Sequence, residues 1–190
     1  MEIILASASP RRAELLDQID VRYTVQVSDI NEDKLPGESA EDLVRRLAVE
    51  KSQALGDEIM QPVLGADTLG VLDGKLLVKP RDYDHAHQML SSMSGRWHEI
   101  LSAVAITYQG KTQVRLNCNR VLFCQLTDQE IKTYWLTGEP QGKAGSYAIQ
   151  GLAASFIERI EGSYSGIMGL PLFETVELLN NLKNKIIPST

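Results

Sequence analysis

The segment Ile3-Ile4-Leu5-Ala6-Ser7-Ala8-Ser9-Pro10-Arg11-Arg12 joins an apolar run directly to the start of a helix. Residues 2–6 have the apolar character of a short buried strand. Ser9 is a residue type favoured at a helix N-cap, and Pro10 suits the first helical position because its missing N–H is not needed there. Strands and helices are mixed in this way throughout the chain, which predicts an α/β fold.

Outward from this segment, the sequence predicts an elongated mixed sheet flanked by helices. Asp73-Gly74 is a pair favoured in tight two-residue turns, so residues 69–78 are predicted to form a hairpin. Thr127 and Glu130 have the spacing of a capping box at a helix start. We expect one domain over residues 1–190, because the chain contains no linker or repeat. Further strands are predicted at 23–27, 62–66, 97–108, 112–124 and 154–160, and further helices at 39–55, 83–93 and from 171.

Composition argues against several classes of protein. The net charge is −6, so the chain lacks the general basic field that holds long nucleic acids. No apolar stretch approaches the roughly 18 residues of a membrane helix, and the N-terminus looks like a strand and not a signal peptide. Cys118 and Cys124 match no metal or disulfide pattern and are predicted to lie in the core. We therefore expect a cytoplasmic protein that binds phosphates through a few local cations, with no nucleic-acid or membrane partner.

The predicted start of the first helix combines free backbone N–H groups with two arginines. The N–H groups and the helix dipole both attract anions. Arg11 and Arg12 oppose the dipole, a conflict that a bound phosphate would resolve, and guanidinium groups match phosphate oxygens. The segment is therefore either a phosphate site or a solvated turn whose arginines pair with nearby carboxylates.

Carboxylates follow two of the predicted strands. Asp67 comes at the end of strand 62–66, where open α/β sheets place their ligands, and it could hold Mg²⁺ or accept a proton from an attacking water. An Asp here could instead cap the following turn. Glu32 lies in the acidic run 29–33, which otherwise reads as a polar loop. Because Mg²⁺ takes one or two carboxylates plus substrate phosphates, Glu32 and Asp67 would suffice.

Two lysines and a glutamine are further candidates. Lys51 falls on the apolar stripe of its helix, so either its stem lies along the surface or its ammonium points into a crevice. Lys79 precedes Pro80 and is held extended, and surface charge is the alternative reading for both lysines. Gln150, in the glycine-rich loop 142–151, offers an acceptor and two donors, which suits the edge of a uracil base. That loop could equally be a structural turn.

Other common sites have no support in the sequence. There is no GxxxxGK[ST] motif, which argues against a P-loop nucleotide site. His85 and His87 lie two apart on a predicted helix and therefore face away from each other. His98 stands alone in a predicted strand.

Together these segments resemble the Maf family of nucleoside triphosphate pyrophosphatases. Several motifs in the family's order, over nearly the whole chain, are far more specific than any one of them. The resemblance implies a fold similar to the inosine triphosphate pyrophosphatases, with two lobes around a deep cleft. The matching motifs are Leu5-Ala6-Ser7-x-Ser9-Pro10-Arg11-Arg12, Asp29-x-x-Glu32, Glu50-Lys51, Gly65-Ala66-Asp67-Thr68, Lys79-Pro80, Lys143-Ala144-Gly145-x-Tyr147-x-Ile149-Gln150-Gly151 and Gly169-Leu170-Pro171-Leu172.

The resemblance also implies roles for individual residues. Family members convert a nucleoside triphosphate and water into the monophosphate and pyrophosphate, using Mg²⁺ or a similar divalent metal such as Mn²⁺ or Co²⁺. The family's general base falls on Asp67, which is also expected to share the metal with Glu32. The substrate-binding residues of the cleft fall on Ser7, Arg12, Lys51 and Lys79.

Three specificity positions of the family fall on Arg11, Thr68 and Gln150. The branch that resembles this chain there prefers dTTP and UTP, whereas a branch acting on 7-methyl-GTP typically has Trp, Gln and Glu. A neutral pyrimidine with two carbonyls suits an amide and a hydroxyl. We therefore expect a house-cleaning dTTP/UTP pyrophosphatase, the alternative being a nucleotide-sensing regulator of cell division or septum formation. The sequence leaves open the cellular pyrimidine nucleotide, the preferred metal and whether a homodimer forms.

Overall fold

The computed structural model describes residues 2–56 and 59–186. Strands and helices are mixed along the chain, which confirms the predicted α/β class. The strands are β1 (Ile3–Leu5), β2 (Tyr23–Val25), β3 (Val63–Leu72), β4 (Lys75–Leu77), β5 (Trp97–Tyr108), β6 (Lys111–Phe123) and β7 (Ile157–Glu161). The helices are α1 (Pro10–Gln18), α2 (Ala40–Gln53), α3 (Tyr83–Met93), α4 (Asp128–Leu136), α5 (Tyr164–Met168) and α6 (Leu172–Ile186), with 3₁₀ turns η1 (Ala144–Ser146) and η2 (Leu152–Phe156). None of the described helices is long and apolar enough to span a bilayer.

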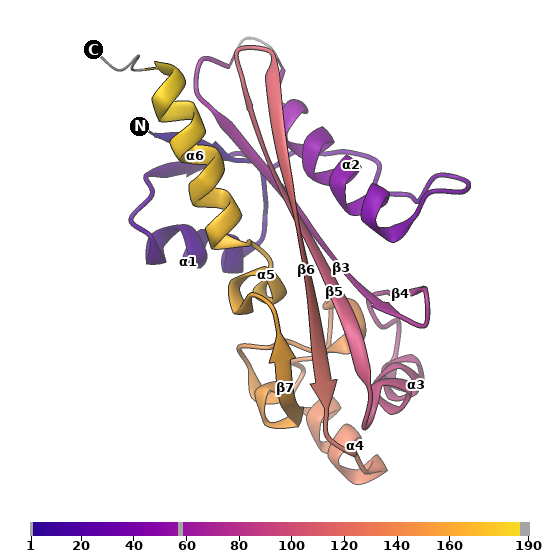
Figure 1. The fold of residues 1–190 in the computed structure, drawn as a ribbon. Coiled ribbons are helices and arrows are strands. Elements are labelled where there is room, and N and C mark those ends of the chain that lie inside the picture. The colour runs from indigo at the N-terminus through magenta and orange to yellow at the C-terminus, as the bar shows by residue number, and fades with distance from the viewer. Residues whose placement is uncertain (1, 57–58, 187–190) are drawn as a thin grey trace.

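The sheet is mixed and elongated, as the sequence predicted. Its strand order is β2-β1-β3-β5-β6-β7, with β4 paired to β3. Strand β1 runs parallel to β2 and β3, and the other pairs are antiparallel. The long strands β3, β5 and β6 run most of the length of the molecule, with α2 on one face and α6 on the other (Figure 1).

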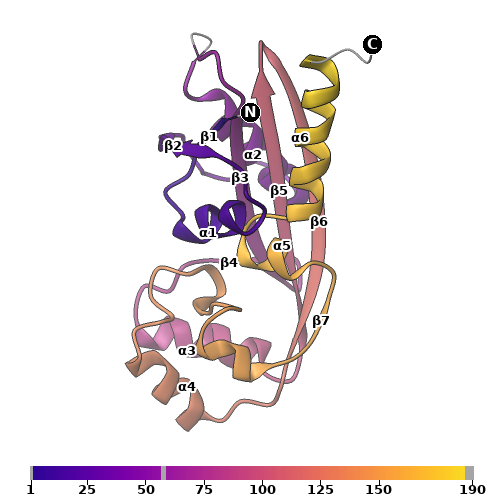
Figure 2. The same cartoon turned by 90° about the vertical axis from the view of Figure 1, so that its left-hand side faces the viewer.

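Separate hydrophobic cores lie at the two ends of these long strands. At one end, residues of β1, α1 and α6 pack together, among them Ile3, Leu16 and Leu178. At the other end, α3, α4 and the glycine-rich segment contribute to a core that includes Leu90 and Tyr147. Figure 2 shows the two resulting lobes, which agree with the expected outline. The assignment of residues 1–190 to a single domain stays a prediction.

Helix α2 packs very closely on strand β3 because Gly65 has no side chain. A Cβ atom at Gly65 would overlap the backbone carbonyl of Ala48 and the backbone amide of Ser52. Side chains alternate between the faces of a strand, so Asp67, two residues further along, lies on the same face as Gly65. The close packing therefore brings α2 residue Lys51 against Asp67.

The structure corrects the predicted end of strand β3. The strand does not stop before Asp67 but continues to Leu72, so Asp67 lies in mid-strand and not at a carboxyl end. The reason is its partner: β3 pairs with β5 without interruption from Val63 to Val71. The turn at Asp73-Gly74 is confirmed, since both residues have positive φ, 50° and 74°.

The cysteine prediction is also wrong in part. Cys118 is exposed and Cys124 is partly exposed. Most side chains of β6 are only partly buried, because the strand lies toward the edge of the sheet and the helices cover it incompletely. Cys118 therefore does not belong to either core.

Candidate active site

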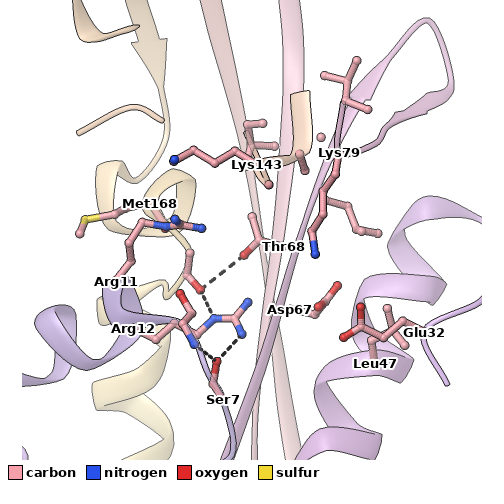
Figure 3. A pocket seen from close by; sticks show the side chains of 18 of the residues that line it. Ser7, Arg11, Arg12, Glu32, Leu47, Asp67, Thr68, Lys79, Lys143 and Met168 are labelled. Atoms are coloured by element: carbon pink, nitrogen blue, oxygen red, sulfur yellow. Dashed lines mark hydrogen bonds between the residues drawn. The ribbon is translucent and has the colours of Figure 1, made fainter. Parts of the chain in front are cut away.

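A cavity of about 720 Å³ is lined by residues of both lobes, and it contains every site residue predicted from the sequence. Figure 3 shows most of these side chains turned toward a common space. Six cationic and three acidic side chains line the cavity, so it is locally positive although the whole chain carries −6. The predicted residues brought together are Ser7, Arg11, Arg12, Glu32, Lys51, Asp67, Thr68, Lys79 and Gln150.

One lysine joins the two predicted metal-binding carboxylates. Lys51 Nζ lies 2.7 Å from Asp67 Oδ1 and 2.6 Å from Glu32 Oε1. Lys51 and Asp67 are only 8% and 7% exposed, whereas the side chain of Glu32 is 57% exposed. The ammonium of Lys51 therefore points into a crevice, which decides between the two readings of its position on α2.

Burial and charge act against each other on the carboxylates. Burial raises the pKa of Asp67, and the neighbouring ammonium of Lys51 opposes that rise. The hydrogen bond from Lys51 is the main cause that lowers the pKa of Glu32. A carboxylate with a raised pKa is a stronger base once ionised, so Asp67 has the properties of a proton acceptor.

The start of helix α1 is built around the hydroxyl of Ser7. Ser9 is the N-cap residue, but its side chain does not cap the helix. Its backbone N–H instead donates to Ser7 Oγ at 3.2 Å, and Arg12 Nη1 donates to the same oxygen at 2.9 Å (Figure 3). Both lone pairs of Ser7 Oγ are thus in use. Its own hydrogen remains for an acceptor in the cavity, such as a phosphate oxygen.

The two arginines of α1 bind backbone carbonyls at the junction of α5 and α6. Arg12 Nε donates to Gly169 O at 3.0 Å, and Arg11 Nε donates to Met168 O at 3.3 Å. Burial lowers the pKa of the Arg12 guanidinium, and Asp67 opposes that effect. The sequence left open a solvated turn whose arginines pair with carboxylates. The structure instead pairs both arginines with backbone carbonyls, which fix the two guanidinium groups at the cavity wall.

The three predicted specificity residues all line the cavity. Thr68 Oγ1 lies 2.8 Å from Ser102 Oγ and 3.4 Å from Gly169 O. Gln150 is exposed and lines the cavity, and apolar residues that include Ile149, Ile167 and Met168 line the same region. A flat base with polar edges fits such a mixed lining.

The donor set of the cavity fits Mg²⁺. Glu32 and Asp67 both contact the ammonium of Lys51, so their oxygens lie near each other. Residues 2–56 and 59–186 contain no group of three or more His, Cys, Asp or Glu side chains suited to a metal. Mg²⁺ usually takes one or two carboxylates and completes its shell with water and substrate phosphates, so two carboxylates are enough.

The sequence alone assigned no function to three groups that lie in the cavity or next to it. Lys143 lines the cavity, where its Nζ donates to Glu139 O at 2.6 Å. Its position in the glycine-rich loop was a usable signal. The carbonyl of Met168 and the hydroxyl of Ser102 left no signal, because their contacts cross from one element to another distant in sequence.

Comparison with known proteins finds relatives of similar length named for one activity. The chain is 48% identical over 188 residues to the "dTTP/UTP pyrophosphatase" of Hahella chejuensis, covering 97% of this chain and 94% of that protein. It is 52% identical over 182 residues to the "dTTP/UTP pyrophosphatase" of Methylobacillus flagellatus, covering 94% and 92%.

The matches among solved structures are more distant. The nucleoside-triphosphatase, or dITP/XTP pyrophosphatase, of Mycobacterium abscessus aligns over 100% of both chains with a TM-score of 0.49 and 16% identity. The Ham1 protein of Staphylococcus aureus aligns over 65% of this chain and 72% of its own, with a TM-score of 0.47 and 16% identity. The sequence profile of the Maf-like protein family matches residues 2–182. The chain therefore belongs to the Maf-like protein family.

Proposed function

We propose that this chain is a nucleotide pyrophosphatase that hydrolyses dTTP and UTP to the monophosphate and pyrophosphate. The observation that carries the proposal is a buried carboxylate, Asp67, in a cavity that also presents the cations Arg12, Lys51 and Lys79. Two relatives named dTTP/UTP pyrophosphatase are 48% and 52% identical to the chain over nearly its whole length, which supports the same activity.

In the proposed reaction, Asp67 accepts a proton from a water molecule. The water oxygen bonds to the α-phosphorus while the bond from that phosphorus to the α–β bridging oxygen breaks, and pyrophosphate leaves with that oxygen. Burial makes ionised Asp67 a stronger base, and Lys51 helps to keep it ionised at neutral pH. Asp67 and Lys51 therefore act as a unit.

Charge on the triphosphate is neutralised from several directions. Lys51, Lys79 and Arg12 supply cations, and the hydroxyl of Ser7 has a hydrogen left to donate. The positive end of the α1 dipole lies at the same wall, since Ser9, Arg11 and Arg12 all line the cavity. Groups fixed before the substrate arrives stabilise developing charge without reorganising, which is the main source of rate in phosphoryl transfer.

The carboxylates Glu32 and Asp67 would hold a divalent metal, with Mg²⁺ the first choice and Mn²⁺ or Co²⁺ as alternatives of the same coordination preference. When bound, such an ion polarises phosphoryl oxygens and offsets their charge. Arg11, Thr68 and Gln150 are proposed to hold the base. Modified pyrimidine triphosphates fall within the proposed house-cleaning role, while cytoplasmic location, the absence of a nucleic-acid partner and a homodimer remain predictions.

The test is the identity of the products and the bond that breaks. Purified protein with Mg²⁺ and UTP in ¹⁸O-labelled water should give UMP that carries the label, together with unlabelled pyrophosphate. UDP and free phosphate, or label in pyrophosphate, would show attack at another phosphorus and would contradict the proposal. Parallel reactions with Mn²⁺, Co²⁺ and a chelator identify the metal requirement.

A further inference from the structure

A buried serine lies directly behind one of the base-specificity residues. Ser102 on β5 is 0% exposed and is the cross-strand partner of Thr68 on β3, so the two side chains share one face of the sheet. Ser102 Oγ lies 2.6 Å from the backbone carbonyl of Gly166 and 2.8 Å from Thr68 Oγ1. The serine thus links the cavity wall to helix α5.

Counting hydrogens assigns a direction to each of these two contacts. Each short oxygen–oxygen contact needs one hydrogen, and the carbonyl of Gly166 supplies none. The hydrogen of Ser102 must therefore fill the contact with Gly166, and the hydrogen of Thr68 must fill the contact with Ser102. Because Ser102 is fully buried, no bulk water supplies a hydrogen in place of either.

Thr68 has one more contact, with the backbone carbonyl of Gly169, and this contact also requires the hydrogen of Thr68. Gly169 O lies 3.4 Å from Thr68 Oγ1 and is also only an acceptor, so it competes for the same single hydrogen. With either partner, Thr68 has no hydrogen left for a ligand. It therefore presents lone pairs to the cavity that it lines.

We propose that Ser102 is a positioning residue that makes Thr68 an obligate hydrogen-bond acceptor and thereby selects uracil and thymine over cytosine. This inference rests on the proposed function. Uracil and thymine carry a hydrogen on N3, whereas neutral cytosine has a lone pair there. A lone pair on Thr68 binds the first and repels the second.

The neighbouring groups complement the rest of the same edge. The carbonyl oxygens on either side of N3–H in uracil and thymine need donors. Arg11 is only a donor, and Gln150 has an amide NH₂, and both line the cavity with Thr68. Two donors and one acceptor are what the two carbonyls and the N3–H of uracil require. Cytosine replaces one carbonyl by an amino group and the N3 hydrogen by a lone pair, so it mismatches twice.

The experiment measures kcat/KM for UTP and CTP, and for dTTP and dCTP, with the wild type and three variants. The wild type should prefer the uracil or thymine nucleotide by roughly tenfold or more. Thr68→Val removes the acceptor and should reduce this preference about tenfold, mainly through slower UTP hydrolysis. Thr68→Ser keeps the hydroxyl and its assigned hydrogen, so it should keep the preference.

Ser102→Ala tests the positioning role itself. Without Ser102, the Thr68 hydrogen is held only by the longer 3.4 Å contact with Gly169 O, which also accepts from Arg12 Nε, so N3 of cytosine can compete for that hydrogen. The preference should then fall about tenfold, while CTP hydrolysis falls less than UTP hydrolysis or rises. A merely structural serine would lower kcat/KM for both nucleotides equally. An unchanged ratio in Ser102→Ala and Thr68→Val overturns the inference. So does a wild type that hydrolyses CTP as well as UTP, although the proposed pyrophosphatase function would then stand.

Binding separates failure of this inference from failure of the proposed function. Calorimetric titration with UMP and CMP measures base selection without hydrolysis. If the wild type hydrolyses none of the nucleotides but binds UMP more tightly, and Thr68→Val abolishes that difference, base selection stands and the proposed hydrolysis fails. If Ser102→Ala does not fold because the carbonyl of Gly166 loses its donor, Thr68→Val still overturns the inference when it leaves the difference between UMP and CMP unchanged.

Discussion

Two buried polar contacts of equal length involve the neighbouring strands β3 and β5 but differ in charge. Lys51 Nζ and Asp67 Oδ1 are 2.7 Å apart at the cavity, and His98 Nε2 and Tyr147 Oη are 2.7 Å apart in the other lobe. Burial lowers the pKa of His98 to about 4 and raises the pKa of Tyr147, so this pair is neutral at pH 7. The pair on Asp67 carries charge.

The difference lies in what completes each pair. His98 and Tyr147 pack edge-on against each other and against Phe123, with ring centroids 4.9 to 5.4 Å apart. Such an aromatic cluster is neutral, and among the residues that the structure describes His98 Nδ1 has no hydrogen-bond partner. The cavity has six cations for three carboxylates, so its charges are balanced only when an anion binds. A cavity lined by an excess of charge of one sign is typical of a binding site, and a buried neutral contact is typical of architecture.

The largest effect is expected from removing the charge of Asp67. Asp67→Asn keeps the shape but loses the base and a metal ligand, so kcat should fall by roughly 10²-fold or more. Nucleotide binding should largely persist, because the phosphate contacts come from other residues. Steady-state kinetics and calorimetry measure the two quantities. Asp73→Asn, in the exposed β3–β4 turn, is the matched control. Near wild-type turnover in Asp67→Asn would mean that another group is the base.

A smaller effect is expected from placing a negative charge beside the pyrimidine ring of the substrate. Gln150→Glu keeps the size but replaces a donor by an anion that faces a carbonyl oxygen of the pyrimidine. The kcat/KM for dTTP and UTP should drop roughly ten- to a hundredfold, since an unpaired carbonyl already costs about 1–3 kcal/mol. Activity on 7-methyl-GTP should fall less, or rise. Equal losses on both substrates would assign Gln150 to the fold or the phosphates instead.

The charged pair can also be broken from the side of Lys51. Lys51→Met keeps the stem and removes a cation that lowers the pKa of both Asp67 and Glu32. The kcat/KM should fall about tenfold. Activity requires ionised Asp67, so the acidic limb of the pH–rate profile should move to higher pH. Lys75→Met, on the exposed end of β4, is the control. An acidic limb that stays in place would show that Lys51 does not tune the base.

The sequence predicted which residues line the cavity but not how they contact one another. Asp67, Lys51 and Gln150 each carried a chemical signal in a short motif, and each lies in the cavity. The contact of Lys51 with both carboxylates depends on the close packing that Gly65 permits. That packing is a property of two elements and leaves no local pattern.

The errors have the same origin. Asp67 was expected at a strand end because the apolar run stops before it, whereas pairing with β5, more than thirty residues later, extends β3 to Leu72. Ser102 carries no signal in its own segment for the same reason, because its acceptor, the carbonyl of Gly166, is 64 residues away. Long-range pairing decides such features, and periodicity in a single segment does not report it.

The smallest effect on turnover, and the sharpest test of the neutral pair, is expected from His98. Its pKa is about 4 in the folded protein, and the ordinary value of 6.5 applies in the unfolded chain. As the pH falls, the unfolded chain therefore binds the proton on His98 before the folded protein does. The stability that neutral His98 contributes is fully present above pH 6.5 and is lost as the pH falls toward 4.

His98→Gln removes this titration. Its free energy of unfolding should be lower than that of the wild type at pH 7, but should decline less steeply between pH 6.5 and 4, by up to about 3 kcal/mol. Urea unfolding at several pH values measures both slopes, with His85→Gln on the surface of α3 as the control. If the wild type and His98→Gln lose stability in parallel, His98 has the same pKa in the folded protein as in the unfolded chain and is protonated in the folded protein below pH 6.5. The second lobe would then hold a buried charge, as the cavity does, and the contrast between the two pairs would disappear.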